Sequence, residues 1–131
     1  MQNSAARVVK RVRKFDHITP VLRELHWLPV QQIIKYKVLL NVFKSIQGNA
    51  PSYVCDLLVR RHSLRVTRSS TDILLNSKRT KSSFGERIFS AMGPNYWNNL
   101  PRFLRAIDDI DTFINSQKCH LFREAFGEIA R

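Results

Sequence analysis

The chain has 131 residues, a length at which one domain buries roughly two-thirds of the surface that its unfolded chain exposes. Eight Phe, three Tyr and two Trp exclude a disordered chain. The 22 Lys and Arg against 10 Asp and Glu give a net charge of +12, so polyanions (RNA, DNA or an anionic membrane) are the first partners to consider. No apolar run is long enough to span a bilayer. Two cysteines, Cys55 and Cys119, exclude a disulfide-dense secreted scaffold and favour a reducing, intracellular compartment.

Residues 1–18 are predicted to form a basic amphipathic helix. Apolar residues recur in it at spacings of three and four, namely Ala5, Val8, Val9, Val12 and Phe15. The basic residues lie mostly opposite and are Arg7, Lys10, Arg11, Arg13 and Lys14. Three interpretations stay open: the solvated face of a packed helix, a nuclear address or nucleic-acid patch at residues 10–14, and a mitochondrial transit peptide or membrane-surface helix. A nuclear or cytoplasmic location is the expectation preferred over the mitochondrial one.

Residues 19–58 are predicted to form a helical core. Thr19 is expected to cap a helix that has Pro20 at its first position, and Pro29 to begin the next helix. That next helix is expected from about Val30 to Gln47, at the centre of the core, with Gly48 as its left-handed stop. Its predicted core face consists of Ile33, Tyr36, Leu39, Leu40, Val42, Phe43 and Ile46. A third helix is expected from Pro51 to Leu58, with packing residues Tyr53, Val54, Leu57 and Leu58 and with Cys55 as a small core residue.

The second half of the chain is predicted to contain a basic loop or hairpin and one long helix. Residues 59–83 are basic, rich in Ser and Thr and without helical periodicity, and Asp72–Asn76 is short enough for a strand. In residues 84–131, Gly85, Gly93 and Pro94 are expected to interrupt an aromatic, turn-rich region whose Trp97 and Leu100 enter the core. A last helix is expected from near Asp111 to Phe126, ended by Gly127, with one face formed by Phe113, Ile114, Gln117, Leu121 and Ala125. The fold class expected is a small, mainly α domain with an irregular basic middle, one domain overall.

The residue types used in catalysis occur without a catalytic pattern. Asp108, Asp109 and Asp111 resemble a metal-binding cluster, but acids just before a helix are typical caps. Cys119 and His120 lack partners at zinc-ligand spacing, and no glycine-rich phosphate loop is present. The sequence therefore predicts no catalytic residue, no metal and no cofactor.

The basic middle is the better functional candidate. Its cations are interleaved with the hydroxyl residues Ser63, Thr67, Ser69, Ser70, Thr71, Ser77 and Thr80, and both groups bind phosphate oxygens. Phe84 and Phe89 follow and are interpreted either as stacking surfaces for unpaired bases or as core residues. The predicted nucleic-acid-binding residues are Arg7, Lys10, Arg11, Arg13, Lys14, Arg60, Arg61, Arg65, Arg68, Lys78, Arg79 and Lys81.

These residues stand in a chain that resembles the C-terminal, post-thumb part of reverse transcriptases from non-LTR retrotransposons, of the jockey-like and chicken-repeat-type long interspersed elements. The resemblance covers nearly the whole chain and is most specific over residues 13–30, Arg-Lys-Phe-Asp-His-Ile-Thr-Pro-Val-Leu-Arg-Glu-Leu-His-Trp-Leu-Pro-Val. Further matches are Ala50-Pro51-Ser52-Tyr53, Arg68-Ser69-Ser70, residues 84–90, Gly93-Pro94, Trp97-Asn98-Asn99-Leu100-Pro101 and residues 120–126. One departure is Gln31-Gln32, where relatives often carry a basic residue.

The resemblance implies a fragment of an RNA-directed DNA polymerase that lacks the polymerase chemistry. In the family the catalytic aspartates lie upstream in an aromatic-x-Asp-Asp hairpin, whereas Ala106-Ile107 precede Asp108-Asp109 here. The beginning at Met1 inside what resembles the last thumb helix predicts a truncated copy. By analogy with its place after the thumb, the fragment is expected to contact template RNA or target DNA and the remainder of a reverse transcriptase. The alternatives are a module that braces the thumb without activity of its own, and a small mitochondrial or membrane-surface protein.

Overall fold

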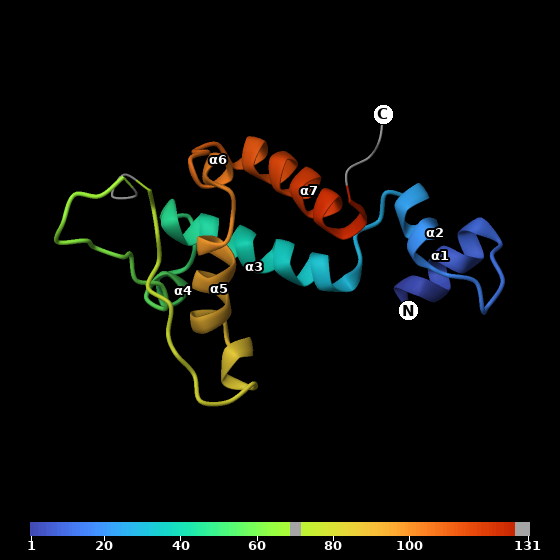
Figure 1. Cartoon of the computed structure of the whole chain (residues 1–131), viewed down its shortest axis with the longest axis horizontal. Helices are drawn as coiled ribbons and strands as arrows, with labels where there is room; N and C mark the ends of the chain where they lie inside the picture. Colours follow the sequence, from blue (N-terminus) through green and yellow to red (C-terminus); the bar gives the residue numbers. More distant parts are fainter. Residues whose placement is uncertain (69–71, 128–131) are drawn as a thin grey trace. The chain divides into compact units, whose positions relative to one another are not determined.

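The computed structural model describes residues 1–68 and 72–127, and it is mainly helical, which confirms the predicted fold class. In chain order the elements are α1 (Gln2–Lys10), α2 (Thr19–Glu24), α3 (Val30–Ile46), α4 (Ser52–Cys55), the short 3-10 helix η1 (Gly85–Arg87), α5 (Phe89–Asn98), α6 (Arg102–Arg105) and α7 (Ile110–Phe126) (Figure 1). Within the described ranges, strand pairing is limited to one antiparallel bridge between Arg60 and Leu75. The predicted strand Asp72–Asn76 is thus reduced to a single paired position.

The chain divides into two compact units, each with its own apolar core. Unit 1 comprises Met1–Tyr36 and Gln117–Arg131, and unit 2 comprises Lys37–Ser116. The division falls inside α3 and inside α7, so each of these helices has residues in both units. The sequence predicts one domain overall, and the number of domains stays a prediction.

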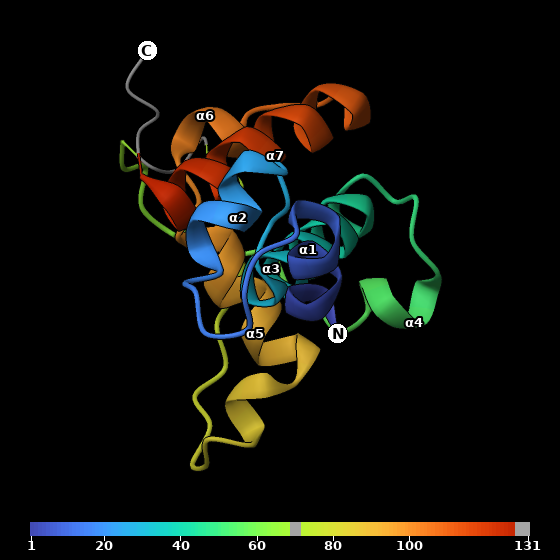
Figure 2. The same cartoon turned by 90° about the vertical axis from the view of Figure 1, so that its right-hand side faces the viewer.

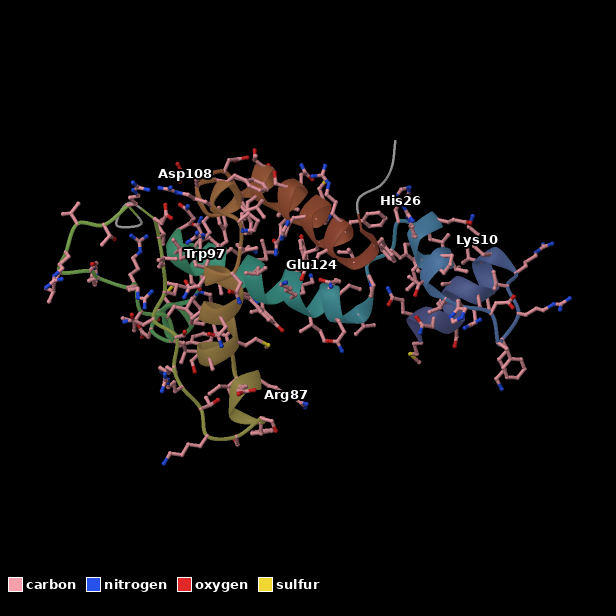
Figure 3. All side chains as sticks on the ribbon, in the orientation of Figure 1. Lys10, His26, Arg87, Trp97, Asp108 and Glu124 are labelled. Atoms are coloured by element: carbon pink, nitrogen blue, oxygen red, sulfur yellow. The ribbon has the colours of Figure 1, made fainter. Side chains whose placement is uncertain are left out.

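The core of unit 2 is built around stacked aromatic rings. Phe43 of α3 and Phe113 of α7 stack with their ring centroids 4.2 Å apart, and Trp97 of α5 lies 6.1 Å from Phe113. Trp97 occupies the interior of this unit in Figure 3, and only 1% of its surface is exposed. The other buried members of this core are Leu39, Val42, Leu75, Leu100 and Leu104. The predicted core positions of the second half of α3, of Trp97 and Leu100, and of Phe113 are therefore confirmed.

Helix α5 contradicts the prediction that Gly93 and Pro94 interrupt residues 84–101. Both residues lie inside the helix and both are buried. A Cβ atom on Gly93 would lie 3.0 Å from Val42 Cγ2, so the glycine lets α5 approach α3 closely. Pro94 lacks the N–H for one helical hydrogen bond. Burial of Trp97 and its neighbours offsets that loss, so tertiary packing overrides a local helix-breaking signal.

In unit 1, the N-terminal helix is shorter than the predicted helix of residues 1–18. The helix ends at Lys10 because Arg11 adopts a left-handed conformation (φ 54°), and the N–H groups of Arg11 and Val12 bond back to Val8 O and Arg7 O. This turn brings Val12 onto the small core of Ala6, Val21 and Leu22. Val8, Val9 and Phe15, which the prediction placed on the packing face, are exposed instead. Helices α1 and α2 lie side by side in both views (Figure 1, Figure 2).

The remaining differences concern helix ends and a few predicted packing residues, among them Ile33, which is exposed on α3 and not part of a core. Thr19 is the first residue of α2 and not its cap, because Ile18 holds the cap position. Helix α4 covers only Ser52–Cys55, and the predicted packing residues Tyr53 and Leu57 are exposed. The predicted helix stops at Gly48 and Gly127 are confirmed, and both glycines are left-handed with φ 76°. On α7, Phe113, Gln117 and Leu121 are fully buried, as the predicted face requires, although Gln117 has only a long bond to Tyr36 O (3.4 Å).

We predict that Gly93→Ala destabilises the protein by about 1 kcal/mol, although alanine favours an isolated helix. The added methyl group would press on the stiff, buried Val42, and overpacking costs about 1–3 kcal/mol, whereas the gain in helix propensity is about 1 kcal/mol. The measurement is urea unfolding of Gly93→Ala, Val42→Ala and the double variant. The two substitutions should couple by at least about 0.5 kcal/mol, because Val42→Ala makes room for the new methyl group. Additive effects would contradict the close contact.

Candidate nucleic-acid interface

The predicted nucleic-acid-binding residues fall into two groups, one in each unit. The N-terminal group (Arg7, Lys10, Arg11, Arg13 and Lys14) belongs to unit 1. The basic segment, here residues 59–83, belongs to unit 2 and carries the other seven: Arg60, Arg61, Arg65, Arg68, Lys78, Arg79 and Lys81. Each group is therefore considered by itself.

Two cations of the N-terminal group take part in the folding of unit 1. Arg7 Nη1 donates to Arg13 O (2.5 Å), which holds the turn after α1. Lys10 Nζ lies 3.2 Å from Glu24 Oε2 and so joins α1 to α2. Arg11, Arg13 and Lys14 are exposed, and Lys14 Nζ lies 5.8 Å from the ring centroid of Phe15. Only these last three side chains are well placed to meet a polyanion.

In the basic segment, all seven predicted cations are exposed. Within the described ranges, no ion pair joins any of them to an acid. Ser63 is occupied locally, because its hydroxyl donates to Arg65 O (2.7 Å) and accepts from Arg65 N (3.3 Å). The hydroxyl residues Ser69, Ser70 and Thr71 lie outside the described residues. The segment thus presents positive charge that its own unit does not neutralise.

A side chain of α5 anchors the basic segment to unit 2. The bridge between Arg60 and Leu75 is closed by two bonds, Arg61 N to Leu74 O and Asn76 N to Val59 O, both 2.8 Å. The N–H and C=O groups of Leu75 face the other side, as alternation along an extended chain requires. There the Asn98 amide accepts from Leu75 N (3.0 Å) and donates to Leu75 O (2.8 Å). Asn98 therefore makes the two hydrogen bonds to Leu75 that a third strand would otherwise make.

Two further contacts support this anchor. Trp97 Nε1 donates to Ile73 O (2.8 Å), so the indole that fills the core also binds the backbone of the basic segment. Asp72 pairs with Arg102 Nε (2.8 Å) and, more loosely, with Arg105 Nη2 (3.7 Å), both from α6. The acid of the segment is thus directed toward α6.

Two hollows border the basic segment. One, of about 710 Å³, is lined by Arg61, Arg65 and His62 together with Ser63, Leu64, Thr67, Asp72 and Leu74. The other, of about 610 Å³, is lined by Lys78, Arg79 and Arg87 together with Ser77, Thr80, Glu86, Met92, Asn95 and Tyr96. Cations outnumber acids in both linings. Arg60, Arg68 and Lys81 are exposed outside these two linings.

Sequence reasoning missed Arg87 as a member of this site. It comes six residues after Lys81, as the last residue of η1, yet it lines the same hollow as Lys78 and Arg79. The signal was present, because residues 60–87 carry eight basic residues against two acids and Arg87 is the last of the eight. Asn95 and Tyr96 gave no such signal, because only the turn of the chain before α5 brings them to this hollow.

The two aromatic candidates differ in their surroundings. Phe89 packs against the core of unit 2, whereas the side chain of Phe84 is 79% exposed. Of the two interpretations left open, the core role therefore describes Phe89, and Phe84 remains available as a stacking surface.

One acid of the cluster around the start of α7, Asp109, caps the helix. Asp109 Oδ2 accepts from Thr112 N (2.9 Å) and from Thr112 Oγ1 (2.7 Å). These two bonds lower the pKa of the Asp109 carboxyl group below its ordinary value of 3.8.

Within the described ranges, no group of three or more His, Cys, Asp and Glu is arranged to hold a metal ion. Cys119 is an exposed free thiol, and Cys55 Sγ donates to Ala50 O (3.5 Å).

Comparison with protein-family models, with curated proteins and with solved structures finds no match to the chain. Across the described ranges, the helices are too short or too polar for any of them to cross a membrane.

We predict that Asn98→Ala destabilises unit 2 by about 3 kcal/mol. It leaves the N–H and C=O groups of a buried residue, Leu75, without partners, and each such group costs about 1–3 kcal/mol. Urea unfolding gives the free energy, and hydrogen exchange at the Leu75 amide should become faster. Asn99→Ala is the matched control, since Asn99 is the next residue and is exposed. Equal effects of the two substitutions would contradict the anchoring role of Asn98.

We predict that Asp109 contributes stability that disappears in acid. Because its pKa is lowered in the folded state, this contribution is fully present above pH 3.8 and is lost as the pH falls through the folded-state pKa. Asp109→Ala should lower the melting temperature at neutral pH, and the difference from wild type should shrink as the solution is acidified below pH 3.8. Asp108→Asn, at the exposed neighbouring acid, is the control. A difference that stays constant with pH would contradict the assignment.

Proposed function

We propose that this chain is a non-catalytic, nucleic-acid-binding fragment of a retrotransposon RNA-directed DNA polymerase, and that it holds template RNA or target DNA through the phosphate backbone. The observation that carries the proposal is the basic segment of unit 2. Seven exposed cations, without ion pairs in the described part of the chain, stand on a segment whose backbone is bonded to α5 and whose Asp72 side chain pairs with α6. Exposed, unneutralised cations on an anchored backbone suit phosphate contacts, which supply affinity and orientation without reading base sequence.

The resemblance of the sequence supports the choice of polymer. A segment that follows the thumb of a reverse transcriptase is next to the template and the target, so a phosphate-binding surface has a direct use there. Asp109 is a helix cap, and the proposal assigns no catalytic role to it or to the neighbouring Asp108.

A second candidate function is the bracing of a larger polymerase by unit 1. Val8 is 77% exposed on α1, and Ile33 and Ile34 are exposed on the first half of α3. Apolar side chains in such positions are typical of surfaces that pack against further protein. In this alternative the fragment alone is folded and binds nucleic acid weakly.

The test of the proposal is RNA and DNA binding by the full chain across a salt series. Phosphate binding predicts that the logarithm of affinity falls with the logarithm of salt by about 0.7–0.9 per phosphate contacted. Replacing Arg60, Arg61, Arg65 and Arg68 together with Gln should reduce that slope by about 3 and weaken binding to all sequences alike. The fold should be preserved, because these side chains are exposed.

The matched control is the triple substitution of Arg11, Arg13 and Lys14 with Gln, which removes exposed cations from unit 1 only. A smaller change in slope is expected there. Affinity that survives the substitutions at residues 60–68 would exclude the basic segment as the binding site. Weak, salt-insensitive binding by the folded wild-type chain would favour the bracing function.

A further inference from the structure

Phe84 is an exposed aromatic residue in a well-defined turn. Its side chain is 79% exposed, although burial would stabilise it. It lies between the last cation of the basic segment, Lys81, and Arg87 of η1. Figure 3 shows Arg87 at the η1 end of unit 2, away from Trp97 and the core.

The turn that carries Phe84 is held by its own hydrogen bonds. Ser82 Oγ accepts from Gly85 N (3.1 Å), and Ser82 O accepts from Glu86 N (3.2 Å). Gly85 lies close against Thr80, since a Cβ atom at Gly85 would lie 3.1 Å from Thr80 Cβ. The two ends of the turn are thereby held together, and the ring of Phe84 is directed outward.

The same turn borders the second hollow. Thr80 and Glu86, on either side of Phe84, both line it, together with the cations Lys78, Arg79 and Arg87. Asn95 and Tyr96 also line the hollow, and Tyr96 packs at the same time against the core of unit 2. At about 610 Å³ it lies within the size range of small-molecule sites, so it has room for a nucleotide. Three cations, a tyrosine and an asparagine in one lining are residue types that bind the phosphate, the base plane and the base edge of a nucleotide.

We propose that this part of unit 2 selects single-stranded nucleic acid, with one nucleotide in the hollow and a neighbouring base stacked on Phe84. The inference rests on the proposed function and adds the class of polymer. A duplex hides the faces of its bases in its own stack, whereas a single strand offers them to an aromatic side chain. The exposed ring therefore favours a single strand over a duplex, in RNA and in DNA alike.

The experiment compares labelled single-stranded RNA with a duplex of the same sequence, using the full chain and Phe84→Ala. We expect the wild type to prefer the single strand and Phe84→Ala to weaken single-strand binding about five- to a hundredfold, the range of stacking losses for one base. Duplex affinity and the salt slope should be unchanged, because Phe84 carries no charge. Phe84→Trp should retain the single-strand affinity and Phe84→Leu should lose it, which separates stacking from general apolar contact.

Phe103→Ala is the matched control, because Phe103 of α6 is also an exposed phenylalanine of unit 2, at 64%. It should leave single-strand affinity unchanged. Circular dichroism verifies that every variant is folded. Salt-dependent binding that Phe84→Ala leaves unaltered, or equal affinity for single strand and duplex, would overturn this inference while the proposed function stands. Absence of salt-dependent binding to any nucleic acid would overturn both.

Discussion

The pair of hydrogen bonds between the Asn98 amide and the backbone of Leu75 is the constraint on which the candidate site depends. One β-bridge is too little to hold an extended segment in place, since even a two-stranded hairpin is marginal alone in water. The Asn98 amide bonds to the N–H and C=O groups of Leu75 on the side away from the bridge, and the Leu75 side chain lies in the aromatic core. Through Leu75 the apolar core and the basic segment of unit 2 are joined, and the bond from Trp97 Nε1 to Ile73 O holds the same stretch of backbone against the core.

Among the described residues, some cations pair with acids of their own unit, whereas those of the basic segment do not. Lys10 and Lys35 pair with Glu24 and Glu124 in unit 1, and in unit 2 the arginines of α6 pair with Asp72. The cations of the basic segment have no such acids in the described residues. Like charges held near one another oppose folding unless a counter-charge arrives. A polyanion that binds these cations would therefore remove their mutual repulsion and stabilise the folded segment.

Apolar spacing in the sequence predicted the long helices correctly. It gave wrong predictions where tertiary packing opposes the local preference of the residues. Spacing in residues 30–47 and 111–126 predicted α3 and α7 nearly to the residue, because long apolar faces and glycine stops are local signals. From the sequence alone, Gly93 and Pro94 are expected to interrupt helical structure. They lie inside α5 because the absence of a Cβ atom at residue 93 admits Val42, a neighbour about fifty residues earlier. At the N-terminus, a left-handed Arg11 ended a helix whose periodicity alone would have continued.

The sequence by itself determined the helical class, the excess of positive charge and its concentration in residues 1–14 and 60–87, because composition and periodicity need no knowledge of distant contacts. It also named the exposed cations of the basic segment as the candidate ligands of phosphate. Only the tertiary structure decided which aromatic residues are core and which are surface, so that Phe89 packs inward while Phe84 stands exposed beside Arg87. Both phenylalanines occur in the same basic, turn-rich stretch, and their roles separate only when α5 packs on α3, a contact between residues far apart in the chain.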